Sequence, residues 1–322
     1  MDFSELLKPY LKKTNKTYYV ALSGGVDSFV LLNELLKIRE NYDLKLSAIH
    51  INHNIQKDSL KWKNFCSEFC RKNRIKYFSR TLRKRTDFSN LEKKLRDERY
   101  KIFESILDKS SILFMGHHLD DTIETFFLRS MRGTRLEGLT SIPRERNLGK
   151  GKIVRPFLDL TKTEILKKAK EDKLKFVNDL SNRDNSFDRN YIRNIVLPEL
   201  EKRWPSYRKN LKQLIENLRE TKDLLSIQRK IDFEQVKVKK NQISIKKLLN
   251  LPQARQKGVF LYWIDLNQFN QPSAKVVNLF FKKFLKDSKT PKAKYSWGTN
   301  SKKGSVCIIK IAKDIKITKI SA

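Results

Sequence analysis

The stretch VALSGGVDSFVLL, residues 20–32, places a short polar loop between two apolar runs. Two glycines and two serines surround one aspartate, Asp27. A tight turn alone needs only one glycine, and a surface linker would not have apolar residues on both sides. The pattern therefore predicts a buried strand, a loop with a task of its own and a helix in direct succession.

The loop has the composition of an anion site. Gly24 and Gly25 allow backbone amides to turn toward a ligand without obstruction by a Cβ atom. A helix that begins near Asp27 and Ser28 adds unpaired amides and the positive end of its dipole. The loop has neither the Walker lysine nor the GxGxxG spacing. A plain structural turn is the alternative, but we expect a loop that holds the pyrophosphate of a nucleotide, with Asp27 placed for Mg²⁺ or the phosphates.

The first half of the chain alternates β-rich runs with segments of helical period. We expect buried strands at 18–22, 44–51, 75–82 and 111–115, and helices at 28–39, 58–72, 89–108 and 117–131. Ser89 and Glu92 have capping-box spacing at the start of the third helix. A further short strand is expected at 153–158. This alternation predicts a Rossmann-like α/β fold, a parallel sheet with helices on both faces.

After about residue 197 the pattern changes to a long polar helix and then to a smaller α+β region. We expect a catalytic domain at 1–200, a helical connector at 201–235 and a small basic domain at 236–322. The net charge is +34, of which +14 belongs to residues 1–200 and +20 to residues 201–322. A lysine-rich composition bias accounts for part of this charge, but the excess favours a nucleic-acid partner held mainly by the C-terminal part.

The cysteines and the hydropathy limit the class of protein. Cysteines occur at 66, 70 and 307, which gives neither a disulfide framework nor a zinc-binding set. Cys66 and Cys70 are four residues apart in an amphipathic segment and are expected in the core. The N-terminal segment is charged, unlike a signal peptide, and no apolar run approaches a membrane span. We expect a cytoplasmic protein with no membrane contact.

Histidines gather at the ends of the expected strands, where open parallel sheets bind their ligands. All four lie in HINHN, residues 50–54, or in GHHLDD, residues 116–121. Four scattered core histidines would not produce this clustering. We therefore expect one shared site at this edge of the sheet.

The stretch GHHLDDTIETFFLRSMRG, residues 116–133, carries acids at helical spacing. His117, Asp121 and Glu124 stand at i, i+4 and i+7, which puts them on one helix face. They could form a metal site, a proton-transfer group or an ordinary polar surface. Beside a nucleotide loop, we expect the acids to hold Mg²⁺ or to position a substrate amine.

The segment LEKKLRDERY, residues 91–100, presents two arginines on one helix face. A helix salt bridge from Glu92 to Arg96 is one interpretation. An arginine directed at phosphate charge, from Arg96 or Arg99, is the other. The sequence leaves both open.

Five stretches, in order, resemble one known family. SGGVDS after a first strand resembles the pyrophosphate loop of the N-type ATP pyrophosphatases, the PP-loop superfamily. Within it, the chain is similar to the tRNA(Ile)-lysidine synthetases over residues 20 to about 200. The stretches that carry the resemblance are SGGVDS, HINHN, LRDERY, GHHLDDTIETFFLRSMRG with GL at 138–139, and DLSNRDNSFDRNYIRN before LPEL.

The resemblance implies a ligase reaction with ATP and Mg²⁺. ATP adenylates the C2 carbonyl oxygen of the wobble cytidine in the CAU anticodon of an isoleucine tRNA. The ε-amine of free L-lysine then attacks C2 and expels AMP, which leaves lysidine. The implied partners are this tRNA and lysine, and a homodimer is compatible with them.

The resemblance also assigns roles to residues. It implies ATP binding by Ser23, Gly24, Gly25, Val26, Asp27, Ser28, His50 and Asn52. It implies catalytic roles for Asp27, Arg96, Arg99, His117, His118, Asp121 and Glu124, with Asp27 and Asp121 as candidate Mg²⁺ ligands. It implies tRNA contacts for Arg132, Arg189, Asn190 and Arg193. The alternative for Arg189 and Arg193 is that they only tie residues 181–194 to the sheet.

Three positions depart from the family pattern, and two other functions compete. Asn54 and Arg135 stand where glycine is usual, and Leu180 replaces a common proline. A tRNA thiolase on the same fold would need reactive cysteines or an iron–sulfur cluster near the nucleotide. A non-catalytic RNA-binding protein would have no use for both SGGVDS and the acids of residues 116–133.

Overall fold

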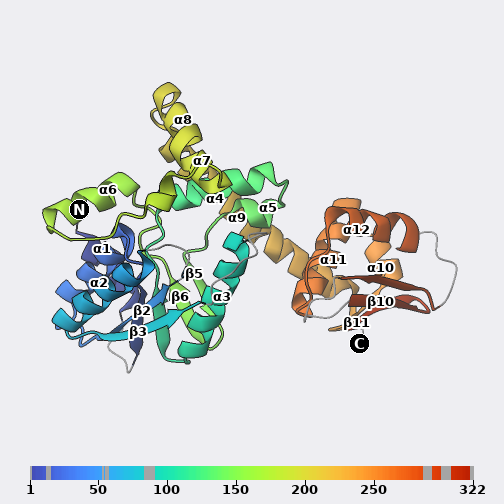
Figure 1. Cartoon of the computed structure of the whole chain (residues 1–322). Helices are drawn as coiled ribbons and strands as arrows, with labels where there is room; N and C mark the ends of the chain where they lie inside the picture. The colour runs from blue at the N-terminus through green and yellow to red at the C-terminus, as the bar shows by residue number, and fades with distance from the viewer. Residues whose placement is uncertain are drawn as a thin grey trace. The chain divides into compact units, whose positions relative to one another are not determined.

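The computed structural model describes residues 2–11, 16–52, 54, 58–82, 91–285, 292–298 and 306–319, without the side chains of residues 91–93 and 180. The chain divides into two compact units, Met1–Glu216 and Asn217–Ala322. The division falls within the long helix α9, Tyr207–Val236 (Figure 1). Each unit has its own sheet and its own hydrophobic core.

The described part of the first unit forms a six-stranded sheet in the order β3-β2-β1-β4-β6-β5. Strands β1, β2, β3, β4 and β6 are parallel to their neighbours, whereas β5 pairs antiparallel with β6 at the edge. This confirms the Rossmann-like prediction. The strands are β1 (Thr17–Ala21), β2 (Lys45–Asn52), β3 (Lys76–Thr81), β4 (Ser111–Phe114), β5 (Glu145–Leu148) and β6 (Gly151–Val154).

Helices connect the strands close to the predicted ranges. The first unit contains α1 (Val26–Lys37), α2 (Ser59–Lys72), α3 (Leu91–Ile106), α4 (Leu119–Met131), α5 (Leu136–Leu139), α6 (Lys162–Glu171), α7 (Asp188–Tyr191) and α8 (Leu197–Arg203), with short turns η1 (Phe3–Leu6), η2 (Lys8–Tyr10), η3 (Leu180–Arg183) and η4 (Ile192–Val196). The predicted capping box lies outside the described residues. Strand β5 was not predicted, because its sequence does not alternate and it is ordered by pairing with β6.

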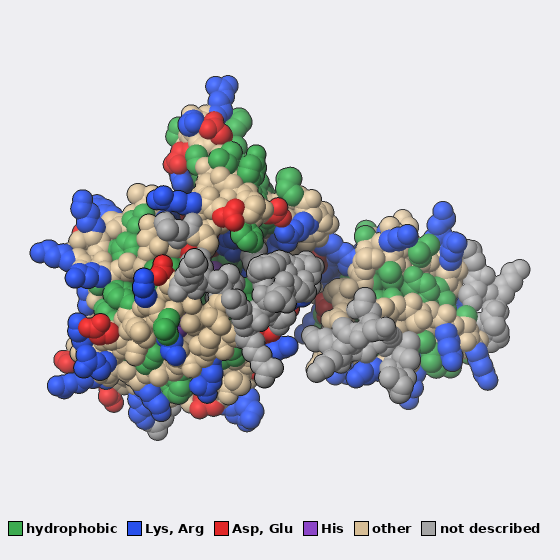
Figure 2. Space-filling view, in the orientation of Figure 1, with side chains coloured by type: hydrophobic (Ala, Val, Ile, Leu, Met, Phe, Trp, Pro, Cys, Tyr) green, Lys and Arg blue, Asp and Glu red, His purple; other side chains and the backbone are tan. Residues whose placement is uncertain are grey.

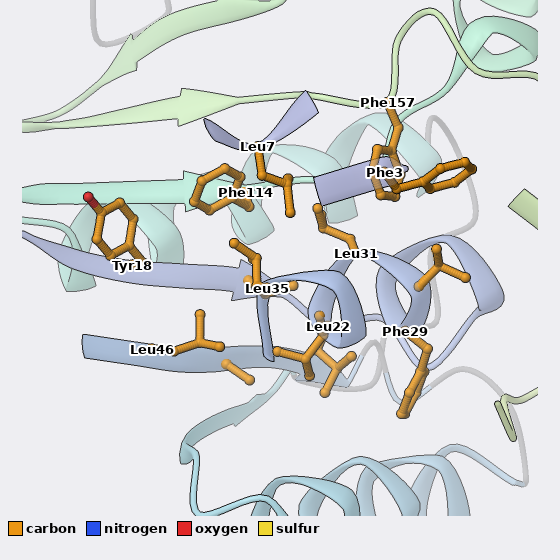
Figure 3. Close-up of a cluster of buried hydrophobic side chains, with 14 of the residues drawn as sticks. Phe3, Leu7, Tyr18, Leu22, Phe29, Leu31, Leu35, Leu46, Phe114 and Phe157 are labelled. Carbon is orange, nitrogen blue, oxygen red and sulfur yellow. The ribbon is translucent and has the colours of Figure 1, made fainter. Parts of the chain in front are cut away.

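Alternate residues of the strands point to opposite faces of the sheet and build two cores. Tyr18 of β1 packs with Phe29 of α1 and with Cys66 of α2 on one face. Tyr19 packs with Phe103 of α3 on the other face. Figure 3 shows the first core, in which aromatic and aliphatic side chains from strands and helices interdigitate. The sheet is thereby held rigidly between two helical layers.

The second unit is the smaller α+β region that the sequence predicted. Its described residues form an antiparallel sheet in the order β7-β8-β11-β10-β9, packed on a core that includes Phe260, Trp263 and Phe280. Its elements are β7 (Lys237–Lys239), β8 (Gln242–Ser244), α10 (Ile245–Leu249), α11 (Gln253–Leu266), α12 (Ala274–Leu279), η5 (Phe280–Leu285), β9 (Lys294–Trp297), β10 (Val306–Ile311) and β11 (Asp314–Lys319).

Basic side chains are spread over the visible face of each unit (Figure 2). Among the described helices, none is both long enough and apolar enough to cross a membrane. The predicted domain limits, 1–200, 201–235 and 236–322, stay a prediction beside the observed two units.

Candidate functional site

The strand order places the reactive loops next to each other. β1 lies between β2 and β4, so the loops that follow β1 and β4 leave the sheet at its switch point. Gly116, which follows β4, comes so close that a Cβ atom there would lie 2.9 Å from the backbone carbonyl carbon of Asp27. Only glycine permits this approach. The two motifs of the sequence therefore form one site.

The SGGVDS loop leaves the start of α1 open. Gly24 has a φ of +100°, in the region that favours glycine. Gly25 is the N-cap of α1 and supplies no side-chain cap, so the first amides of the helix have no side-chain partner there. Ser28 Oγ accepts from Ser23 N at 3.2 Å and donates to the Gly25 carbonyl at 2.9 Å. This is the helix terminus that an anion site needs.

One buried imidazole lies among three aspartates at the centre of the site. His118 is 3% exposed. Its Nε2 lies 3.7 Å from Asp27 Oδ1 and 3.6 Å from Asp121 Oδ2, and its Nδ1 lies 3.7 Å from Asp120 Oδ2. Asp27 comes from the first loop and the other two from α4. His118 therefore links the nucleotide loop to the acidic helix.

Basic groups from distant segments balance these acids. Lys162 Nζ donates to Asp27 Oδ1 at 2.6 Å, and Lys162 N donates to Asp120 Oδ2 at 2.7 Å. Arg208 of α9 donates through Nε to Asp120 Oδ1 at 2.9 Å. Sequence reasoning missed Asp120, Lys162 and Arg208. Lys162 was detectable in principle, because it opens the helix after β6 and so lies at the same sheet edge.

Glu124 is fully buried and doubly paired. Arg189 Nε donates to its Oε2 at 2.7 Å, and Arg193 Nε donates to its Oε1 at 2.6 Å. Arg189 also donates through Nη2 to Asp121 Oδ1 at 2.8 Å. These side chains hold the segment around α7 and η4 to helix α4 rather than to the sheet. Their contact with tRNA stays a prediction.

The other two predicted tRNA residues lie on the surface nearby. Arg132 is largely exposed and pairs with Asp188 at 3.1 Å. Asn190 donates through Nδ2 to the carbonyls of Ser181 at 2.9 Å and Asp184 at 2.8 Å. Asn190 therefore holds the loop between η3 and α7 closed, and a tRNA role for either residue stays a prediction.

Asp121 favours its charged form although its carboxylate is only 14% exposed. Burial by itself would raise its pKa, but the charges of His118 and Arg189 lower it well below the usual range. The backbone amide of His118 also donates to Asp121 Oδ2 at 3.1 Å. Asp121 is therefore better suited to holding a positive charge than to accepting a proton.

His117 requires a correction. The spacing predicted it on the same helix face as Asp121 and Glu124, but α4 begins at Leu119, so His117 lies in the preceding loop. Its Nδ1 accepts from Arg155 Nε at 3.3 Å. Burial, together with the charge of Arg155, lowers the pKa of His117 to about 3. His117 is neutral, and the Arg155 contact leaves the imidazole proton on Nε2.

The two arginines of α3 surround an aromatic ring instead of facing the PP-loop. The guanidinium carbons of Arg96 and Arg99 lie 5.5 and 5.8 Å from the ring centre of Tyr100. The predicted salt bridge to Glu92 lies outside the described side chains. A catalytic role for Arg96 or Arg99 stays a prediction.

The end of β2 presents a buried acceptor. His50 Nδ1 lies 2.9 Å from the Leu22 carbonyl, so it carries the proton, and burial lowers the pKa of this histidine. Among the described residues, none hydrogen-bonds to His50 Nε2.

Asn52 Oδ1 accepts from Asn54 N at 2.8 Å, and Asn54 takes a left-handed φ of 53° in place of the family's usual glycine. His53 lies outside the described residues.

Arg135, the second departure, needs no glycine. Its φ of −78° is ordinary for any residue. The Leu180 side chain, the third departure, lies outside the described part of the chain.

A pocket of about 250 Å³ opens beside these charges. Its walls combine both signs of charge with an apolar side, which suits a ligand that carries an amine, a carboxylate or a phosphate. The lining residues are His118, Asp120, Glu124, Lys162, Thr163, Arg193, Leu197, Pro198 and Arg208.

The donor set fits a magnesium ion only together with nucleotide phosphates. Within the described residues, no group of three or more His, Cys, Asp or Glu side chains could hold a metal ion. Magnesium in nucleotide sites typically takes one or two carboxylates and completes its shell with phosphates and water. Asp27 and Asp121, which approach the same imidazole nitrogen, meet that smaller requirement.

Residues 1–200 match the PP-loop domain family. The chain is 39% identical over 272 residues to a tRNA(Ile)-lysidine synthase of Buchnera aphidicola subsp. Acyrthosiphon pisum, covering 84% of this chain and 62% of the relative. It is 36% identical to the tRNA(Ile)-lysidine synthase of Buchnera aphidicola subsp. Schizaphis graminum, and this match covers 97% of this chain and 70% of the relative. It is 33% identical to the tRNA(Ile)-lysidine synthase of Coxiella burnetii, and this match covers 81% of this chain and 58% of the relative. The chain therefore spans about three fifths to seven tenths of the length of these relatives.

A solved structure shows the same fold. The U34-tRNA thiolase NcsA from Methanococcus maripaludis, with its [4Fe-4S] cluster, aligns with a TM-score of 0.53 and 21% identity. The alignment covers 68% of this chain and 78% of that one. At this identity the similarity concerns the fold alone.

Proposed function

The chain belongs to the tRNA(Ile)-lysidine synthase family of PP-loop proteins, and on this premise we propose that it joins lysine to a tRNA cytidine at the expense of ATP. The proposed substrate is the wobble cytidine of a CAU anticodon in isoleucine tRNA. The observation that carries the proposal is the contact of the SGGVDS loop with α4, in which one imidazole approaches both Asp27 and Asp121. ATP and a substrate amine would meet there.

In the first step the C2 carbonyl oxygen of cytidine attacks the α-phosphate of ATP, and pyrophosphate leaves. The open amides of α1 and the hydroxyls of Ser23 and Ser28 would hold the pyrophosphate. Lys162, now 2.6 Å from Asp27, would turn toward the phosphates. Asp27 would hold Mg²⁺, which supplies charge neutralisation for the phosphates when bound. His50 Nε2 would accept a hydrogen bond from the adenosine.

In the second step the lysine amine attacks C2, and AMP leaves with the C2 oxygen. The amine arrives as an ammonium ion and must lose a proton, to a water molecule, before attack. Asp121, with its lowered pKa, would hold the ammonium ion. Both oxygens of Glu124 are paired with arginines, so the ammonium must displace one of these contacts to reach Glu124. Neutral His117 would donate a hydrogen bond from Nε2–H to the developing charge on the base.

The cysteines weigh against sulfur insertion. Cys66 and Cys70 are buried in the core beneath α1, and burial raises the pKa of each thiol to about 12. Cys307 lies in the second unit. Thiolates are the species that bind iron and transfer sulfur. The thiols of Cys66 and Cys70 are protonated at neutral pH and belong to the packing of α2.

The test is incorporation of labelled lysine. The protein is incubated with ATP, Mg²⁺, radiolabelled lysine and an unmodified isoleucine tRNA bearing CAU, beside the same tRNA with a changed wobble base. We expect base-stable label in the first tRNA and none in the second. AMP release without lysine incorporation would move the reaction to another tRNA modification, and no AMP release at all would leave an RNA-binding protein.

A further inference from the structure

Several arginines gather around Tyr100 on the sheet face that α3 covers. The guanidinium carbon of Arg146 lies 4.4 Å from the ring centre, closer than those of Arg96 and Arg99. Arg155 adds an Nη2 group 3.4 Å from the Tyr100 hydroxyl. We call Tyr100, Arg96, Arg146 and Arg155 the arginine cluster.

Tertiary structure assembles the cluster from three separate segments. Tyr100 and Arg96 come from α3, Arg146 from β5, and Arg155 follows β6. Arg155 is only 2% exposed and donates to the Pro143 carbonyl at 2.8 Å. A buried arginine is rare unless its charge is paired. The antiparallel edge strand β5 thereby brings a third arginine onto the ring.

The cluster has too few negative charges. Among the described side chains, no carboxylate pairs with Arg146 or Arg155, and Glu145, the neighbour of Arg146, pairs with Lys152 instead. Guanidinium groups this close repel each other. Burial would raise the pKa of Tyr100, yet the surrounding arginines, Arg155 foremost, lower it overall. An anion placed here would relieve the repulsion.

The position of the arginine cluster in the fold indicates where a bound anion would lie. Phe103 of α3 packs on one sheet face, whereas Phe29 of α1, the helix that follows the pyrophosphate loop, packs on the other. Arg155 also contacts His117 at 3.3 Å, which joins the cluster to the loop before α4. An anion here would lie beside the loop that carries His117, on the sheet face opposite to α1.

We propose that the arginine cluster binds a phosphodiester group of the RNA substrate next to the nucleotide that reacts. Planar guanidinium groups match phosphate oxygens in a bidentate way. The Tyr100 ring keeps Arg96 and Arg146 extended over its faces before RNA arrives, so less side-chain entropy is lost on binding. The identity of the RNA rests on the proposed function.

The test compares Arg146→Gln with Arg71→Gln in the full chain. Both arginines are exposed, and Arg71 lies on α2, which packs on the opposite sheet face. Binding of unmodified isoleucine tRNA is measured at several salt concentrations, without ATP or lysine. For Arg146→Gln we expect a Kd about 5- to 10-fold higher and a log–log salt slope smaller by about 1. Arg71→Gln should leave both values near those of the parent protein.

Two results would overturn the proposal. The first is equal salt slopes for the two variants. The second is a higher KM for ATP in Arg146→Gln with unchanged tRNA affinity, which would assign the phosphate to ATP. Because the binding assay needs no reaction, a parent protein that fails to incorporate lysine would refute the proposed function while leaving this site testable.

A conservative variant examines the geometry. Arg146→Lys keeps the charge but not the planar group, so we expect a tRNA affinity between those of the parent protein and Arg146→Gln. Full affinity in Arg146→Lys would mean that charge alone acts there, and the bidentate site would be wrong. Thermal unfolding of each variant verifies that the fold is retained.

Discussion

The first unit carries two charged clusters that use the same residue types and balance them in opposite ways. Beside the SGGVDS loop, Glu124 is paired with Arg189 and Arg193, and Asp27 with Lys162. Around Tyr100, Arg146 and Arg155 have no carboxylate partner among the described side chains. The first cluster is neutralised by the protein itself. The second is left to be neutralised by a ligand.

The difference has opposite consequences for stability and binding. A buried ion pair is costly to break, because the remaining charge is stranded away from water. An arginine removed from a repelling cluster costs little folding free energy but removes a ligand contact. Substitutions in the first cluster should therefore affect folding or chemistry, and those in the second should affect RNA binding.

The largest expected effect is on stability, from Glu124→Ala. The change strands two arginines around a fully buried position, so the free energy of unfolding should fall by about 3–5 kcal/mol. Urea denaturation monitored by circular dichroism measures the fall. Glu124→Gln, which keeps one acceptor and the shape, is the control and should lose less. A loss below about 1 kcal/mol for Glu124→Ala would show that the paired cluster does not support the fold.

The next effect is on chemistry, from Asp27→Ala. The change removes the carboxylate that faces Lys162 and His118, so kcat for lysine incorporation should fall by roughly 10²–10³-fold. The affinity for tRNA should stay within about twofold, as measured by filter binding. A fall in tRNA affinity as large as the fall in kcat would show that Asp27 does not act on the nucleotide alone. The two clusters would then not differ in whether they affect chemistry or RNA binding.

Cys66, an uncharged residue beside the SGGVDS loop, shows how much stability and activity change when no ion pair is broken. Cys66 lies under the loop, its Sγ 3.6 Å from where a Cβ on Gly24 would be. Cys66→Ala should lower the free energy of unfolding by about 1 kcal/mol and leave lysine incorporation within about twofold. Because the pKa of this thiol is raised to about 12, iodoacetamide at pH 8 should label it only after unfolding. Rapid labelling of the folded protein would revive the thiolase alternative.

The smallest expected effect is the stability of Arg146→Gln. This exposed arginine repels its neighbours, so its removal should change the free energy of unfolding by no more than about 0.5 kcal/mol. The pKa of Tyr100 should rise, since one of the charges that lower it is lost. Titration by NMR, with Tyr100→Phe to assign the signal, measures the rise. A large destabilisation would mean that Arg146 supports the fold, and the arginines around Tyr100 would then not differ from the ion-paired cluster in their effect on stability.

Local patterns in the sequence determined much of this protein. Alternating strands and helices predicted the parallel sheet, because side-chain periodicity reflects which face is buried. SGGVDS predicted an open helix start, because glycines and a missing cap are properties of adjacent residues. The same motifs indicated the lysidine synthetase family, which the relatives confirm. His117 was the misplaced residue, since helical spacing does not show where a helix begins.

Only the tertiary structure decided how the charges are paired. Lys162 meets Asp27 across 135 residues of sequence, and Arg189 meets Glu124 across 65. Arg146 reaches Tyr100 because β5 pairs with β6 at the sheet edge. An ion pair depends on distances between side chains that the sheet brings together, and no local pattern records those distances. The sequence therefore specified which charges the site contains, and the fold specified which of them are already neutralised and which await a ligand.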